Sequence, residues 1–237
     1  MSFNNVNASK SSDGPTGKIL LPFHSILLLR KAARMHQIKD GATCALLSAA
    51  ACEAFLNDIQ CHYSFFIKCK RPFELRDGNF VQCVSEDENQ FSKELIALEE
   101  NKKQTTKKYK KVNKLLTGQS LGNSSKYQGL KNLMKIRNAL VHLKADAIQL
   151  EEHEGMENNV LPDILIPVKS KIDATLFRNS WIDVLDTEGF CHWCLESAYL
   201  IIGEITKALI GDGDDENGNV SVQRFVGGEY ARQLVGS

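Results

Sequence analysis

The sequence has no excess of charge of either sign. Its 237 residues carry 29 basic and 29 acidic side chains. A chain without net charge is not drawn as a whole to nucleic acid or to an anionic membrane, so any basic site must be local. Glycine-rich phosphate loops and nucleophile elbows are also missing, which argues against the common nucleotide-hydrolysing and α/β-hydrolase classes.

No membrane or secretory segment is expected. The apolar run 19–29 contains Pro22 and His24 and is too short to span a bilayer. The first residues show no basic start with an apolar stretch and a small-residue cleavage site. The seven cysteines fit no regular disulfide framework. We therefore expect reduced thiols, a cytoplasmic location and no membrane association.

Apolar periodicity predicts an all-α fold, an antiparallel helical bundle of about five to six helices. Residues 1–17 are predicted to be a disordered leader, residues 18–210 one helical domain, and residues 211–237 a flexible tail. An irregular insertion, extended or with a short strand, is expected near 144–180, where Pro162 and Pro167 occur. The predicted helices span 22–37, 40–67, 89–116, 125–142 and 187–210.

The stretch "KIRNALVHLKAD", residues 135–146, places charged side chains on an apolar helix. At 100° per residue, Arg137 falls in the middle of a stripe made by Leu130, Leu133, Met134 and Val141. A guanidinium in such a stripe needs an anion or strong hydrogen-bond acceptors. A buried structural salt bridge is the simplest explanation. However, Asn138 and His142 lie near the same helix end, and together the three offer a charge, a polar contact and a group that titrates near neutrality.

A second apolar helix is interrupted in a similar way by "AACEAFLND", residues 50–58. Leu46, Ala50, Glu53 and Asn57 share one stripe, so a carboxylate and an amide are expected on an apolar face. These side chains either cap or pack locally, or Glu53 is the internal partner of Arg137 or of another cation.

These segments resemble the HEPN domain family. The resemblance consists of "E-A-x-x-N" at Glu53–Asn57, followed by "R-N-x-x-x-H" at Arg137–His142, and it covers roughly residues 40–210. It implies an all-α bundle and a metal-independent endoribonuclease, with RNA as the partner. It also implies a homodimer in which two such motifs face one cleft, and a toxin or phage-defence role.

The implied chemistry needs neither metal nor cofactor. RNA supplies its own nucleophile, the ribose 2′-OH, and His142 would move the proton. Arg137 would bind the phosphate bidentately, Asn138 would support it, and Glu53 would orient the site. The toxin branch that is controlled by a nucleotidyltransferase antitoxin carries Tyr two residues after the His, whereas Lys144 stands here. That departure argues against control by such an antitoxin or defence-system partner. It does not argue against the cleavage chemistry.

A non-catalytic function of another class remains open. A HEPN-like module could bind RNA or a nucleotide, or mediate dimerisation, without cleaving anything. The orientation of Arg137 discriminates the two hypotheses, because a guanidinium sealed against Glu53 would favour the binding or structural module.

A run of lysines, "KKQTTKKYKKVNK" at residues 102–114, is a second basic feature. Helical spacing places several of them on one face, where they either form an ordinary solvated surface or bind RNA phosphates. The candidate RNA-binding residues are Lys103, Lys107, Lys110, Lys111 and Lys114.

Two further patterns are interpreted as structural. "CHWC" at residues 191–194 has metal-ligand spacing but no second such pair, and it lies in a helical pattern. Core cysteines are the better interpretation. "DGDDENGN" at residues 212–219 resembles a calcium loop, but Gln223 stands where the twelfth-position Glu belongs, so an acidic linker is expected.

Overall fold

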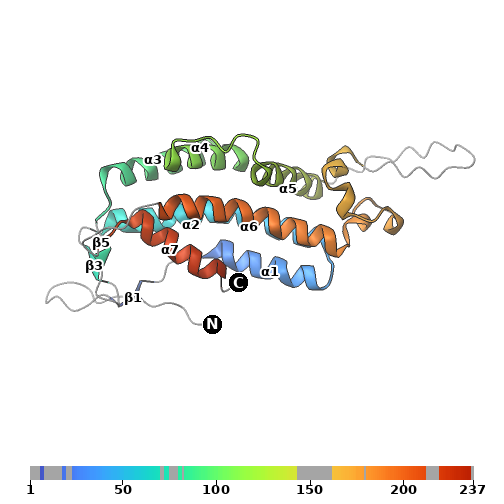
Figure 1. Ribbon diagram of the computed structural model, residues 1–237, viewed down its shortest axis with the longest axis horizontal. Coiled ribbons are helices and arrows are strands. Elements are labelled where there is room, and N and C mark those ends of the chain that lie inside the picture. Colours follow the sequence, from blue (N-terminus) through green and yellow to red (C-terminus); the bar gives the residue numbers. More distant parts are fainter. Residues whose placement is uncertain are drawn as a thin grey trace, which may run out of the picture. The chain divides into compact units, whose positions relative to one another are not determined.

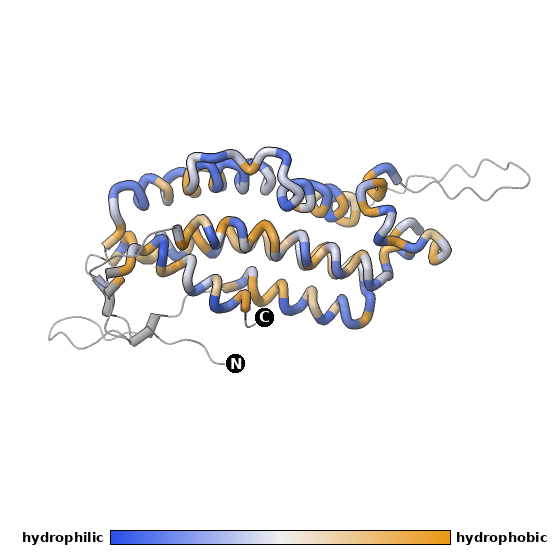
Figure 2. The backbone as a smooth tube through the Cα atoms, in the orientation of Figure 1, coloured by the Kyte–Doolittle hydropathy of each residue, from blue (hydrophilic) through white to orange (hydrophobic). Residues whose placement is uncertain are grey.

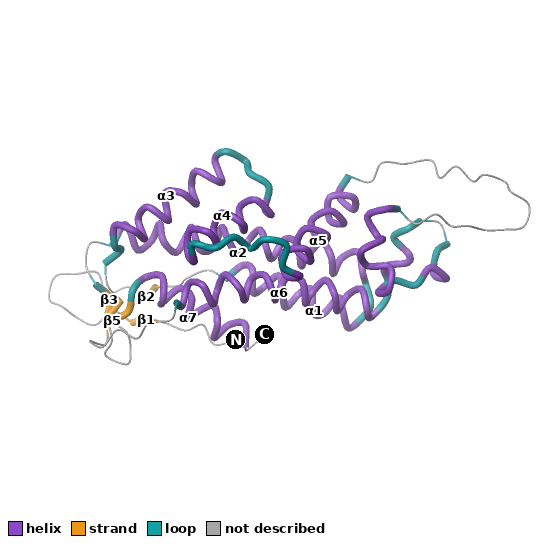
Figure 3. Tube along the Cα trace, turned by 45° about the horizontal axis from the view of Figure 1, so that its top comes forward, coloured by secondary structure: helices purple, strands orange, loops and turns teal. Residues whose placement is uncertain are grey.

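The computed structural model describes residues 23–69, 72–74, 80–81, 83–142, 162–178, 180–211 and 219–235, together with the strands at Val6–Asn7 and Lys18–Ile19. Helices dominate these residues (Figure 3), which confirms the all-α helical bundle. The α-helices are α1 (His24–Gln37), α2 (Gly41–Lys68), α3 (Glu86–Glu100), α4 (Thr105–Thr117), α5 (Ser125–Val141), α6 (Glu188–Ile210) and α7 (Val222–Val235). The 3₁₀ helices are η1 (Asp163–Lys171), η2 (Ala174–Leu176) and η3 (Asp183–Leu185).

The strands are only two residues long. β1 (Val6–Asn7) pairs antiparallel with β2 (Lys18–Ile19). β3 (Phe73–Glu74) pairs antiparallel with β4 (Phe80–Val81), which pairs in parallel with β5 (Asn219–Val220). Such short ladders join helices and do not change the fold class.

Several helix ends are where local sequence signals place them. The Asp40 carboxylate accepts from the backbone N–H of Thr43 at 2.9 Å, as expected for the N-cap of α2. Gly118 closes α4 with a φ of 70°, a conformation that glycine adopts without strain. α5 and α6 begin and end within two residues of their predicted limits.

The single helical region predicted for 89–116 is two helices. α3 begins earlier, at a capping box in which Ser85 Oγ accepts from the Glu88 N–H and the Glu88 carboxylate accepts from the Ser85 N–H. It ends at Asn101, and Lys102 then takes a left-handed φ of 48°. This turn lets α4 pack against α3 (Figure 3).

Two predictions about irregular regions are wrong for the residues that the structure describes. The predicted flexible tail contains α7, whose Val222, Phe225 and Tyr230 are buried. A Cβ on Gly227 would lie 2.9 Å from the backbone nitrogen of Ile210, so α7 packs closely on the end of α6. The predicted extended insertion forms η1 and η2 in residues 162–178. The leader at 1–17 lies outside the described residues except for β1.

The chain divides into two compact units. Unit 1 comprises Met1–Ile26, Cys52–Gly122 and Ile202–Ser237, and unit 2 comprises Leu27–Ala51 and Asn123–Ile201. Consequently α1, α2 and α6, which are labelled in Figure 1, each contribute residues to both units.

Unit 1 has an aromatic core around the second half of α2. The Phe55 ring stacks on Tyr109 of α4 and meets Tyr230 of α7 edge to face, with ring centroids 6.3 and 4.7 Å apart. The Tyr109 hydroxyl donates to the backbone oxygen of Cys52 at 2.9 Å. The Glu88 carboxylate also accepts from the backbone N–H of Gln223 at 2.7 Å. A buried acid thereby stabilises the N-termini of both α3 and α7.

Unit 2 has a tightly packed core at the start of α2. A Cβ on Gly41 would lie 2.0 Å from the backbone oxygen of Leu185, so a larger residue would not fit. The Gly41 N–H donates to the Asp186 carboxylate at 3.0 Å. In the same unit, η1 packs against α5 and buries Leu165 and Val168.

Among the described residues, α2 is the one helix that is long and apolar enough to cross a membrane. In its most apolar 18-residue window, 56% of the residues are buried inside the structure, as is typical of a core helix.

Candidate functional site

The predicted catalytic residues of α5 lie at its C-terminal end. Ser124 caps the N-terminus of the helix, and its side chain accepts from the backbone N–H of Tyr127. Its buried face consists of Tyr127, Leu130, Leu133, Met134, Ile136 and Leu140. His142 caps the C-terminus of the helix, and its backbone N–H donates to the backbone oxygen of Asn138 at 2.9 Å.

Arg137 lies within the arc of this buried face but near the end of the helix. It is half-buried, and its guanidinium donates to the Asn138 side-chain oxygen at 3.0 Å on the exposed side. The prediction that Val141 belongs to the apolar stripe is wrong, because this side chain is 54% exposed. In the last turn of α5, Leu140 is buried, whereas Asn138 and Val141 are exposed. The charge of Arg137 therefore lies near the surface and is not sealed in the core.

His142 and Asn138 are both exposed. Within the described residues, the imidazole of His142 has no hydrogen-bond partner, and residues 143–161 lie outside the described part of the chain. The structure thus brings Arg137 and Asn138 into contact and places His142 one helical turn beyond Asn138.

The stripe predicted on α2 is not the apolar face of that helix. Leu46, Ala50 and Glu53 are only half-buried, and Asn57 is exposed. Glu53 accepts from the Thr105 hydroxyl of α4 at 3.2 Å, which is a contact within unit 1. Arg137 belongs to unit 2, so the ion pair between Glu53 and Arg137 stays a prediction.

The lysines of α4 lie opposite its buried residues Tyr109 and Val112. All five predicted RNA-binding lysines are exposed, although Lys103 precedes the helix. Lys111 lies 3.6 Å from Glu94 of α3, and the neighbouring Lys108 forms an ion pair with Glu99. α3 carries six acidic residues and a single lysine. The lysine face is therefore partly balanced by the acidic helix packed against it.

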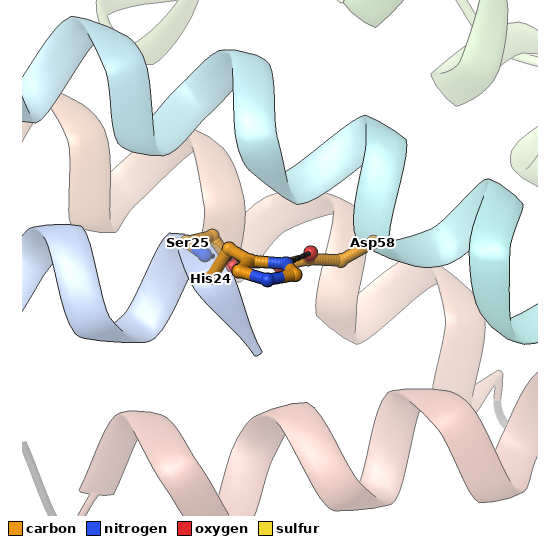
Figure 4. Close-up of polar contacts among 3 residues, drawn as sticks. All are labelled: His24, Ser25 and Asp58. Carbon is orange, nitrogen blue, oxygen red and sulfur yellow. Dashed lines mark hydrogen bonds and ion pairs between the residues drawn. The ribbon is translucent and has the colours of Figure 1, made fainter. Parts of the chain in front are cut away.

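A polar cluster at the start of α1 was not predicted (Figure 4). The Asp58 carboxylate is only 2% exposed. It accepts from the backbone N–H and the hydroxyl of Ser25, both at 3.0 Å, and lies 2.9 Å from the His24 Nδ1. Ser25 donates to Asp58 and not to His24, so this is no nucleophilic triad. Asp58 instead satisfies one of the first backbone donors of α1, the N–H of Ser25. The sequence signal that could have revealed this cluster is the position of the Asp58 carboxylate between the apolar residues Phe55 and Ile59.

The "CHWC" cysteines are core residues, as predicted. Cys191 and Cys194 are fully buried beside Cys44, whose Sγ lies 3.4 Å from the Cys191 backbone oxygen. A hydrogen bond with Cys191 lowers the pKa of Cys44, but a hydrogen bond with Cys194 and burial outweigh it and raise that pKa to about 12. Such thiols are unreactive. Among the described residues, no group of three or more side chains could hold a metal ion. The acidic segment 212–218 lies outside them.

Comparison with protein-family models, with curated proteins and with solved structures finds no match to this chain. The fold defines the class, an all-α helical protein. The resemblance to the HEPN domain rests on the residues of the chain itself.

Proposed function

We propose that the chain is a metal-independent endoribonuclease of the HEPN type. The observation that carries the proposal is the hydrogen bond between Arg137 and Asn138 at the exposed end of α5, with His142 one turn further on. An imidazole can transfer protons and a guanidinium can stabilise the phosphate charge in phosphodiester cleavage, and Asn138 and His142 are exposed.

In this proposal the ribose 2′-OH attacks the adjacent phosphorus and the bond to the 5′-oxygen breaks. The products are a 2′,3′-cyclic phosphate and a 5′-hydroxyl. His142 either removes the 2′ proton or protonates the leaving oxygen, a contribution of about 10²–10⁴-fold. Arg137 binds the phosphate oxygens and offsets the charge that grows in the transition state. Asn138 holds the guanidinium by the hydrogen bond described above, and Glu53 stays a predicted orienting residue.

One histidine does not serve easily as both acid and base in one turnover. A homodimer that brings two motifs to one cleft would supply both groups, and it would also give the His142 imidazole a partner. We therefore propose a homodimer as the active form, in a toxin or phage-defence role.

A non-catalytic module that binds RNA or a nucleotide, or mediates dimerisation, is the second candidate. It is favoured by the His142 ring, which has no hydrogen-bond partner among the described residues. Catalytic histidines are usually oriented by a further group. Cleavage activity decides between the two candidates.

The test is cleavage of labelled RNA in EDTA by the wild-type protein, by His142→Ala and by His192→Ala. His192 is an exposed histidine of α6 in the same unit and serves as the matched control. We expect the wild type and His192→Ala to cleave RNA and His142→Ala to be inactive. Equal activity of all three proteins would contradict the proposal, and binding without cleavage would support the second candidate.

A further inference from the structure

We propose that a polar stripe along α5, formed by Lys131, Lys135, Asn138 and His142, binds the backbone of a single-stranded RNA and leads it to the helix end. This α5 polar stripe names the substrate class of the site above, and it rests on the proposed function. It differs from the lysine face of α4, for which the sequence left open whether it is a solvated surface or an RNA-binding face.

Helical geometry aligns the four residues. They follow one another at intervals of four, three and four residues, and at 100° per residue they fall within an arc of about 60°. Lys135, Asn138 and His142 are exposed, and Lys131 is half-buried, as expected when the stem of a lysine lies along the helix. The core residues Leu133 and Leu140 lie on the opposite side. Figure 2 shows hydrophilic and hydrophobic residues alternating around α5.

All charged residues of α5 are basic. From Ser124 to His142 the chain contains Lys126, Lys131, Lys135 and Arg137 but no Asp or Glu. Within the described residues, neither Lys131 nor Lys135 forms a salt bridge or a hydrogen bond. A solvated helix face usually mixes both signs at spacings of three or four residues. A face with cations alone is the better match for a polyanion.

These cations would also favour the binding of a phosphate at the end of the helix. The last turn of α5 presents backbone carbonyls, equivalent to about half a negative charge, which repels a phosphate. Arg137 at the scissile position and the two lysines upstream offset that repulsion. The rise from Lys131 to Lys135 is about 6 Å, comparable to the separation of neighbouring phosphates along an extended strand.

A single strand fits this surface better than a duplex. The stripe is one row of charges on one helix, whereas duplex RNA is bound through contacts that span two successive grooves. A single strand can also rotate its ribose until the 2′-OH lies in line with the leaving oxygen, which stacking in an A-form helix resists.

The proposal is tested by binding to a fluorescent single-stranded RNA that is fully 2′-O-methylated, because this probe cannot be cleaved. Wild type is compared with the double variant Lys131→Gln/Lys135→Gln over a range of salt concentrations. The matched control is Lys107→Gln/Lys110→Gln, which removes the same charge from α4. Two lost phosphate contacts should reduce the log–log salt slope by about 1.4 and weaken binding, whereas the α4 variant should keep most of the wild-type slope.

Three further measurements make the result decisive. Lys131→Arg/Lys135→Arg should restore binding, and Lys135→Gln alone, at an exposed position, should show about half of the slope change. A duplex of the same sequence should bind more weakly than the single strand. An unchanged slope in the α5 variant, or a larger change in the α4 variant, would overturn the α5 polar stripe. If the stripe binds RNA but the wild type does not cleave unmodified RNA, the nuclease proposal is wrong and the stripe proposal stands. If wild type and the α5 variant cleave unmodified RNA equally, the stripe proposal is wrong and the nuclease proposal stands.

Discussion

α4 and α5 are both lysine-rich helices without a single acidic residue, yet their surroundings differ. α4 packs on the acidic helix α3, where Glu94 and Glu99 pair with Lys111 and Lys108. α5 carries Lys131 and Lys135 without such partners among the described residues. We infer from the comparison that the number of lysines in a helix does not by itself identify a polyanion site, because acidic side chains on a neighbouring element offset their charge.

The two helices also differ in how they end. α4 ends at Gly118, whose left-handed conformation terminates the helix and satisfies the Lys114 carbonyl. α5 ends with exposed polar residues, Asn138 and His142, beside the half-buried Arg137. We infer that α4 mainly builds the fold of unit 1 and that α5 carries the chemistry. Four predictions follow this division from the largest expected effect to the smallest.

Arg137→Lys should lower cleavage by about 10²–10³-fold, comparable to the loss of one transition-state hydrogen-bond donor in other enzymes. The charge is kept, but an ammonium lacks the planar fork that binds two phosphate oxygens. Single-turnover rates at saturating RNA measure the effect. Lys110→Arg on α4, a reverse exchange of the same two residue types, should leave the rate unchanged. Near-wild-type cleavage by Arg137→Lys would place Arg137 outside the chemistry.

Tyr109→Phe should lower the free energy of unfolding by about 0.5–1.5 kcal/mol while cleavage persists. The change removes the hydroxyl that donates to the backbone oxygen of Cys52 and keeps the ring that stacks on Phe55. Denaturant unfolding provides the free energy. If stability were unaffected and cleavage were lost, α4 would belong to the site and the division between the two helices would be wrong.

Glu94→Gln/Glu99→Gln should convert the lysine face into a stronger RNA-binding surface. Removing both carboxylates frees Lys108 and Lys111, so the salt slope of RNA binding should steepen by up to about 1.4. Each lost surface ion pair should cost less than about 1 kcal/mol of stability. Fluorescence anisotropy at several salt concentrations is the measurement. No change in slope would mean that α3 does not suppress RNA binding by α4.

His142→Ala should change the free energy of unfolding by no more than about 0.5 kcal/mol, because the side chain is exposed and the helix-ending hydrogen bond uses its backbone N–H. Arg137→Ala should cost more, since the half-buried stem packs within the arc of the core face. Thermal melts of the two variants give the comparison. Unfolding of His142→Ala would assign the imidazole to the core.

Local signals predicted most of the fold. The ends of α2, α4, α5 and α6 were predicted from Asp40, the Thr117–Gly118 turn and the apolar periodicity. These signals are reliable because helix caps and glycine conformations depend on neighbouring residues. α7 was missed because a glycine-rich acidic segment precedes it. Its contacts are also distant in sequence: Glu88 accepts from the Gln223 N–H, and Tyr230 meets the ring of Phe55.

The part of the candidate site that lies on one helix could be predicted from the sequence. The grouping of Arg137, Asn138 and His142 follows from helical spacing. The face that a helix buries depends on which elements cover it, and for this reason the stripe through Asn57 and the position of Val141 were predicted wrongly. The balance of α4 by α3 is likewise a tertiary effect. Asp58 escaped prediction because its partners Ser25 and His24 lie on another helix.

The chemical nature of the cleaved RNA ends tests the central claim most directly. Purified protein is incubated with a defined single-stranded RNA in EDTA, and the fragments are identified by mass spectrometry. Cleavage by the 2′-OH predicts a 2′,3′-cyclic phosphate on one fragment and a 5′-hydroxyl on the other, with no cleavage of DNA or of 2′-O-methylated RNA. A 5′-phosphate and a 3′-hydroxyl, or DNA cleaved at a comparable rate, would contradict the account.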